Sequence, residues 1–166
     1  KKELTVALLM EAYSHLKTAE ELKEEGNGEF RKAKWQSAAA KYWAALRKKG
    51  LNRELTVKLL VNLAMCLVKL ERWEEAVEAA TGAIDGAATK KASLAKALVS
   101  RARAYRSSPH RGQAGVELAM TDLLRASQLE PKDKVIAAEI KETATRLAST
   151  NDDEATPTTT TTTTTT

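Results

Sequence analysis

Apolar side chains recur at intervals of three and four along most of the chain, which is the spacing of one face of an α-helix. No segment alternates apolar and polar residues in the manner of a β-strand. The pattern therefore predicts an all-α protein. One long first helix is expected from the face formed by Leu4, Leu8, Ala12, Leu16, Ala19 and Leu22. Six further helices are expected within residues 34–50, 54–70, 72–84, 90–108, 115–130 and 133–148.

Small residues divide these helices into three units with matching positions. The spacing between the small residues of successive first helices is thirty-eight residues, and the third unit carries five additional residues, which we place in a loop over residues 106–115. A plain helical bundle with accidental alanine periodicity is the alternative, but repetition at a fixed period favours stacked helix pairs. The matched positions are Gly26, Ala38, Tyr42 and Ala45, then Ala64, Ala76, Ala80 and Ala83, then Ala102, Ala119, Leu123 and Ala126.

With these units the chain resembles a tetratricopeptide-repeat domain. The repeat of that family has 34 residues, and we assign the excess in each unit to the connections between units. The resemblance implies a right-handed α-solenoid of three helix–turn–helix repeats, with an extended N-terminal helix and a C-terminal capping helix. The boundaries are 1–18 for the extension, 19–52, 57–90 and 95–131 for the repeats, 132–149 for the capping helix and 150–166 for a Thr-rich tail expected to be disordered.

The repeat also explains a glycine in the middle of a helix. Within "ELKEEGNGEF", Gly26 costs the helix roughly 1 kcal/mol relative to alanine. In a helix pair, a residue without a side chain lets the second helix approach closely. We therefore expect the helix to continue through Gly26 and its partner to pack directly against it.

Residues on the first helices resemble one branch of the family, which docks the acidic C-terminal tails of chaperones. That branch has a lysine shortly before a Gly-Asn pair, as in "LKEEGN" here. The resemblance implies that Lys23 and Asn27 in the first unit, Asn62 in the second and Lys96 in the third hold the carboxylates of an EEVD-type tail. The fifth position of the pattern is an arginine, and this chain has Ser100 there.

Two further basic residues belong to the expected binding surface. Lys69 lies on the first helix of the second unit, and Arg103, seven residues after Lys96, is the better placed of two substitutes for the missing arginine, Arg101 being the other. Hydrogen bonds from such groups to a carboxylate are about twice as strong as neutral ones.

Each of these residues also has an ordinary structural explanation, although one of them is harder to explain in that way. Lys23 could be one charge among many on a solvated face, and Asn27 could simply follow a helix interruption. Asn62 differs, because an unsatisfied amide buried within "KLLVNLAMCL" would be costly.

Composition narrows the class of function. The 166 residues carry a formal net charge of +5 and one cysteine, Cys66, so a disulfide framework is excluded and a reducing, cytoplasmic location is expected. No apolar run is long enough for a membrane span, and no spacing of Cys and His suits a metal. We expect no cofactor and no enzymatic activity, with the carboxylates on the solvated surface. Nucleic-acid binding is not expected, because Trp35, Trp43 and Trp73 are interpreted as core residues rather than stacking platforms.

The sequence thus predicts a monomeric peptide-binding module of co-chaperone type. Its expected partner is the acidic C-terminal tail of a heat-shock protein 90 or 70 chaperone. The alternative is a repeat scaffold that binds an unrelated peptide or helix, with Ser100 marking the loss of chaperone binding. The threonine run at residues 158–166 could instead be a modified stalk or a peptide that lies in the groove.

Overall fold

The computed structural model describes residues 8, 17–87 and 90–153. Within these residues the chain is helical and contains no strand, which confirms the all-α prediction. The helices are α2 (Ala19–Arg31), α3 (Trp35–Leu46), α4 (Arg53–Lys69), α5 (Trp73–Gly86), α6 (Lys91–Ser107), α7 (Gly112–Leu129) and α8 (Lys134–Asp153).

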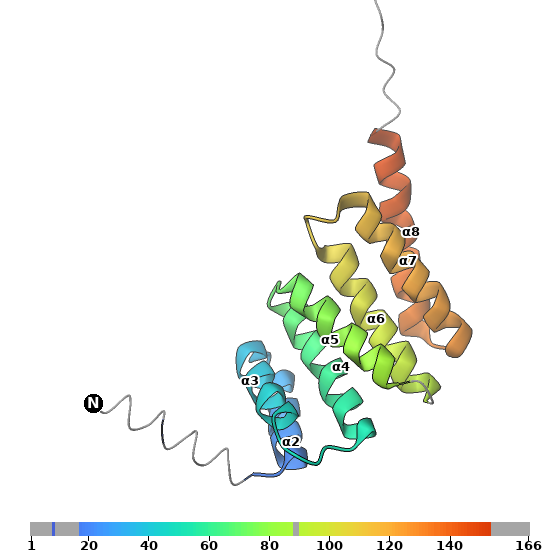
Figure 1. The fold of residues 1–166 in the computed structure, drawn as a ribbon. Helices are drawn as coiled ribbons and strands as arrows, with labels where there is room; N and C mark the ends of the chain where they lie inside the picture. The colour runs from blue at the N-terminus through green and yellow to red at the C-terminus, as the bar shows by residue number, and fades with distance from the viewer. Residues whose placement is uncertain (1–7, 9–16, 88–89, 154–166) are drawn as a thin grey trace, which may run out of the picture.

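The helices stack as three pairs followed by a cap (Figure 1). Helix α2 packs on α3, α4 on α5, and α6 on α7, while α3–α4 and α5–α6 contacts join the pairs and α8 packs on α7. The first helices also contact one another in order, α2 with α4 and α4 with α6. The first helices therefore form one layer of a solenoid, and the second helices form the other.

The first helix begins later than the apolar pattern predicts. Thr18 is in the extended conformation (φ −72°, ψ 163°), and its side chain accepts a hydrogen bond from the backbone of Glu21, whose own side chain bonds back to Thr18. This capping box satisfies backbone N–H groups that a helix start leaves without partners. The prediction of one continuous helix from Leu4 to Leu22 is therefore wrong at Thr18. Of the expected extension, only Leu8 lies within the described residues, where it is helical and exposed.

The five additional residues of the third unit do not form a long loop. Turns of three residues join α2 to α3 and α4 to α5, and a turn of four, residues 108–111, joins α6 to α7. Helix α7 begins seven residues before Ala119, whereas α3 begins only three residues before its matching Ala38. One extra helical turn and one extra turn residue thus account for the insertion, and the prediction of a loop over residues 106–115 is wrong.

The excess over the family's repeat length is likewise helical. Helices α4 and α6 each begin eleven residues before their small residues, Ala64 and Ala102, whereas α2 begins seven residues before Gly26. The expected longer connections are therefore additional turns at the starts of two helices. At the other end of the stack, α8 continues to Asp153, four residues beyond its expected end. Residues 154–166 of the expected tail lie outside the described residues.

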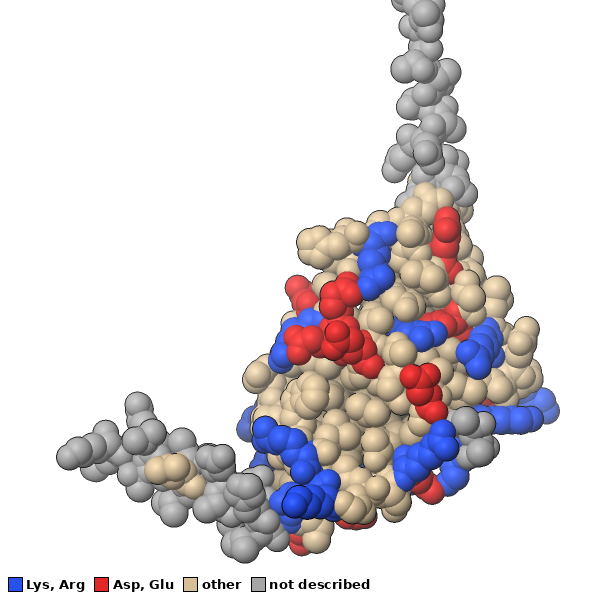
Figure 2. Space-filling view, in the orientation of Figure 1, with Lys and Arg blue, Asp and Glu red and all other residues tan. Residues whose placement is uncertain are grey.

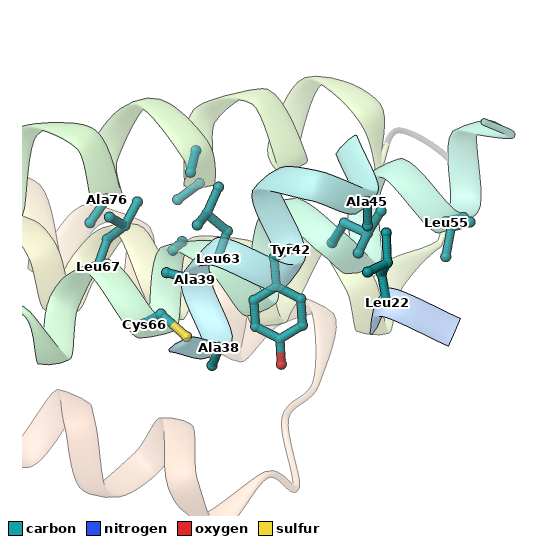
Figure 3. Close-up of a cluster of buried hydrophobic side chains, with 14 of the residues drawn as sticks. Leu22, Ala38, Ala39, Tyr42, Ala45, Leu55, Leu63, Cys66, Leu67 and Ala76 are labelled. Atoms are coloured by element: carbon teal, nitrogen blue, oxygen red, sulfur yellow. The ribbon is translucent and has the colours of Figure 1, made fainter. Parts of the chain in front are cut away.

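The matched positions of the repeat form the core. Nine of the twelve are 0 % exposed, Tyr42 and Ala102 are 1 % exposed, and Gly26 is also buried. Gly26 lies against the ring of Tyr42 from α3: a Cβ built on Gly26 would stand 2.6 Å from Cε1 of that ring. Figure 3 shows the ring among side chains of the first two units, including Leu22 and Leu63. The predicted close approach at Gly26 is confirmed.

Two expectations about surface and core are wrong. Trp43, taken as a core residue, is 41 % exposed on α3, whereas Trp35 and Trp73 are half-buried first residues of their helices. Not every carboxylate is solvated either: Asp122 on α7 is buried and accepts two hydrogen bonds from Arg101 of α6, at 2.7 and 2.8 Å. A buried carboxylate of this kind depends on its partner for stability.

The two glycines of α2 provide a matched test of this packing. We expect Gly26→Ala to lower the free energy of unfolding by about 1–2 kcal/mol, because overpacking against Tyr42 outweighs the gain in helix propensity. Gly28→Ala should raise it by up to about 1 kcal/mol, because a Cβ there meets nothing within 4 Å. Urea unfolding followed by circular dichroism measures both. Shifts of the same sign for the two variants would contradict the packing.

Candidate functional site

The layer of first helices is hollowed along α4 and α6. Two adjoining cavities, of about 360 and 430 Å³, share Met65, Ser100 and Arg103 in their linings. We call their combined surface the groove. Phe30 of α2 lines one end, and the start of α8 lines the other through Ile136. The groove therefore runs across all three units to the cap.

Five of the seven predicted site residues line the groove: Asn62, Lys69, Lys96, Ser100 and Arg103. The other two, Lys23 and Asn27, lie on α2 and line neither cavity. Asn27 is joined to the groove by a hydrogen bond, since Nδ2 of Asn62 donates to Oδ1 of Asn27 at 2.9 Å. The structure therefore brings six of the seven residues together, whereas the described contact of Lys23 is with Glu24 of its own helix. Figure 2, drawn in the orientation of Figure 1, shows basic and acidic side chains interspersed with uncharged ones on the face turned to the viewer.

Lys23 and Asn27 converge on a single carboxylate. Nζ of Lys23 lies 2.9 Å from one oxygen of Glu24, and Nδ2 of Asn27 donates to the other oxygen at 3.2 Å. These two contacts lower the pKa of the Glu24 carboxyl below its ordinary value, and the contact from Lys23 has the larger effect. Glu24 is itself exposed, so solvent and ions can replace it. Lys23 and Asn27 therefore share one carboxylate, which belongs to an exposed residue of their own helix.

Asn27 and Asn62 are positioned by the core beneath them. Oδ1 of Asn27 accepts a second hydrogen bond, at 2.8 Å, from the hydroxyl of Tyr42, the residue that packs on Gly26. Burial raises the pKa of the Tyr42 phenol to about 12, so its proton is retained for this bond at neutral pH. The amides of two successive units are thus fixed by a tyrosine from the second helix of the first unit. The side chain of Asn62 is half-buried, and its hydrogen bond to Asn27 explains how an amide is accommodated among the apolar residues of α4.

The third unit departs from the expected arrangement. Ser100 is buried, and its hydroxyl donates to the backbone carbonyl of Lys96 one turn earlier, at 2.9 Å. Arg103 lies beside it in the groove lining, as the spacing predicts, but its guanidinium is bound to Glu139 of α8, with Nε at 2.7 Å and Nη2 at 2.6 Å from Oε1. Arg101 points toward α7, where its guanidinium donates a hydrogen bond to Asp122. It is therefore not a second substitute for the missing arginine.

Glu139 is the site residue that sequence reasoning missed. It lies one turn after Ile136 and directly before Ile140, both of which pack against the third unit, so a carboxylate beside apolar positions was the available signal. Its partners are far away in sequence: Arg103 and Arg106, more than thirty residues earlier. Helix periodicity alone does not show which residues of another helix face such a position.

The described residues offer little other reactive chemistry. No group of three or more His, Cys, Asp or Glu among them could hold a metal ion. Cys66 is a buried free thiol, and burial raises its pKa to about 12. A thiol is reactive as its thiolate, so Cys66 is a packed apolar residue at neutral pH.

Comparison with known proteins decides the family. No protein-family profile matches the chain. Its fold matches the Arabidopsis OM64 TPR domain with a TM-score of 0.63 and 25 % identity, over 75 % of this chain and 93 % of that one. It also matches the second TPR domain of human RPAP3, solved in complex with the HSP70 peptide SGPTIEEVD, with a TM-score of 0.60 and 27 % identity, over 74 % and 92 % of the two chains. This chain is a tetratricopeptide-repeat domain.

Two longer proteins contain a segment similar to this tetratricopeptide-repeat domain. The myosin chaperone UNC-45 from C. elegans, solved in complex with a Hsp90 peptide, matches with a TM-score of 0.68 and 28 % identity, over 84 % of the domain and 14 % of that chain. A DnaJ homolog subfamily C member 7 homolog of Schizosaccharomyces pombe is 30 % identical over 135 residues, or 81 % of the domain. The domain spans only about a quarter (26 %) of that relative's length.

Among the described helices of the domain, none has the length and apolar character needed to cross a membrane. This finding concerns residues 17–87 and 90–153 together with Leu8.

The raised pKa of Cys66 predicts how stability depends on pH. An unfolded chain releases the thiol proton near the ordinary pKa of 9.0, whereas the folded domain retains it to about 12. The contribution of this thiol to the free energy of unfolding is therefore complete below pH 9 and is lost as the pH rises toward 12. We expect the stability difference between the wild type and Cys66→Ala to shrink between about pH 8 and about pH 10.5.

Chemical denaturation of the two proteins at each pH measures this difference, and other alkaline titrations cancel in the comparison. A difference that does not depend on pH would mean that the thiol is not buried as described.

Proposed function

We propose that this tetratricopeptide-repeat domain is a peptide-binding module of co-chaperone type. It would hold the acidic C-terminal tail of a heat-shock protein 90 or 70 chaperone in the groove. Lys23, Asn27 and Asn62 would bind carboxylates at the C-terminal end of the peptide. Lys96 of α6 would bind a further carboxylate of the peptide. Lys69 would add a positive charge at the rim.

One observation carries this proposal: Lys23 and Asn27 already bind the two oxygens of one carboxylate, that of Glu24. A C-terminal carboxylate offers the same two oxygens with the same charge. Exchange of Glu24 for the ligand costs little, because an exposed ion pair contributes only weakly to stability. Asn62 adds a third polar group beside this position, held in place by Asn27.

The relatives support the same ligand class. The second TPR domain of human RPAP3 and UNC-45 from C. elegans were solved with HSP70 and Hsp90 peptides respectively. The groove also offers Val61, Met65 and Val99 for apolar side chains of a ligand. We include a monomeric state and a reducing compartment such as the cytosol in the proposal, the latter because Cys66 is a free thiol.

The third unit makes this a modified site. Ser100 supplies no positive charge, and its hydroxyl is already bonded to Lys96. By the usual strength of a hydrogen bond to a charged group, about 1.5–3 kcal/mol, the absence of an arginine would weaken binding roughly tenfold to a hundredfold. Ser100 is therefore the observation that favours the second candidate, a scaffold that binds an unrelated peptide or helix.

Calorimetric titration with a free-acid peptide ending in MEEVD tests the proposal. We expect micromolar binding that is lost when the C-terminus of the peptide is amidated, because Lys23 and Asn27 then have no terminal charge to bind. Lys23→Ala and Asn62→Ala should each weaken binding at least about tenfold.

Lys34→Ala is the matched control, since it removes the same charge from an exposed residue at the start of α3, outside the groove. Absence of heat with the free-acid peptide, from a domain that circular dichroism shows to be folded, would favour the scaffold. Equal binding of the acid and amide peptides would also contradict the proposal.

A further inference from the structure

We infer that Glu139 of the capping helix is an internal competitor for the ligand: its carboxylate occupies the arginine that a peptide carboxylate would otherwise bind in the third unit. The inference rests on the proposed function, and it identifies what regulates the strength and charge selectivity of the same site.

The geometry of Glu139 is that of a bound ligand carboxylate. It lines the groove together with Ser100 and Arg103, and its Oε1 is held by Nε and Nη2 of Arg103 at 2.7 and 2.6 Å. Its other oxygen, Oε2, lies 2.8 Å from Nη2 of Arg106. The side chain of Glu139 is 12 % exposed, so solvent screens these contacts far less than those of an exposed pair.

The two arginines differ in their access to a ligand. The side chain of Arg106 is 8 % exposed and also donates to Thr143 of α8 at 2.9 Å, so it anchors the cap. The side chain of Arg103 is 32 % exposed and, among the described contacts, binds Glu139 alone. Arg103 is therefore the arginine that could turn to a peptide, provided that Glu139 releases it.

Charge explains why Glu139 opposes an acidic ligand. A peptide carboxylate that approaches Arg103 meets a positive charge that is already neutralised and a negative charge beside it. Like charges in a partly buried site repel, and a guanidinium shared by two carboxylates binds each more weakly. The described contacts of Lys23 and Asn27 involve neither Glu139 nor Arg103, so binding of a carboxylate to these two residues should not incur this competition. With Glu139 in place, the groove should therefore select for a terminal carboxylate more than for acidic side chains farther along the peptide.

A purely structural role for Glu139 predicts something different. If the ion pairs only fasten α8 to α6, then removal of the charge should loosen the cap and leave affinity unchanged or reduced. If Glu139 competes, removal should increase affinity, and the increase should depend on Arg103. A double-mutant cycle between the two residues separates these cases.

The experiment measures affinity for the free-acid MEEVD peptide by calorimetry in wild type, Glu139→Gln, Arg103→Ala and the double variant. We expect Glu139→Gln to bind about threefold to tenfold more tightly, the range of one charge-assisted contact that is partly screened. Arg103→Ala should change the wild-type affinity by less than about twofold. In the Glu139→Gln variant, adding Arg103→Ala should abolish the gain in peptide affinity.

Glu142→Gln is the matched control. It makes the same change in net charge one turn later on α8, where Glu142 is exposed and binds Arg146 and, at 3.4 Å, Arg106. We expect less than about a twofold change in affinity, because an exposed charge is screened. Thermal unfolding of every variant verifies that α8 remains folded.

The outcomes separate this inference from the proposed function. If wild type binds and folded Glu139→Gln binds no more tightly, the inference is overturned and the proposed function stands. If only Glu139→Gln binds, Glu139 masks a latent site and the inference is supported. If neither folded protein binds, both are overturned. An equal gain in Glu142→Gln would also overturn the inference, since the effect would then be one of net charge.

Discussion

The close approach of α3 to α2 at Gly26 is the constraint on which the rest of the domain depends. The Tyr42 ring occupies the space where a side chain of residue 26 would lie, and its hydroxyl then reaches Asn27. Asn27 in turn holds Asn62 of the next unit. A packing requirement of the core thus positions the polar groups on the surface, because an interior packed at crystal-like density has little room to deform. The candidate site lies on helices rather than on a loop, and the amides of its first two units are fixed by hydrogen bonds that begin at the buried Tyr42.

The groove is asymmetric in its electrostatics. At the first unit, Lys23 and Asn27 bind an exposed carboxylate of their own helix, which a ligand can displace at little cost. At the third unit, Arg103 binds a carboxylate from the cap that is largely shielded from solvent. The capping helix therefore has two consequences: it covers the exposed end of the stack, as a terminal element of a solenoid must, and it changes the charge of the surface beside it. Ser100 and Glu139 line the same cavity, where the first carries no charge and the second carries a negative charge.

Much of the fold could be predicted from the sequence, because the small residues of a repeat are fixed by packing and recur at a constant period. The role of Gly26 and the surface shared by Asn62, Lys96 and Arg103 follow from that period. The location of the additional residues could not be predicted from the period, because an insertion of one helical turn and an insertion in a loop can add the same number of residues to the sequence. Glu139 could not be found from helical periodicity either, because its partner lies on a helix two elements away. The start of α2 at Thr18 was missed for a further reason: apolar spacing continues across this position, while the capping box that begins the helix is a local signal.

In the proposed function, the paired amides of Asn27 and Asn62 receive a ligand carboxylate. The most direct measurement is a ¹⁵N-edited NMR titration that follows the side-chain amide signals of these two residues as peptide is added. We expect a free-acid MEEVD peptide to shift both signals together, with the same saturation, and the amidated peptide to shift neither. Shifts confined to the outer helices α5 and α7, or equal shifts with the two peptides, would contradict the proposed function.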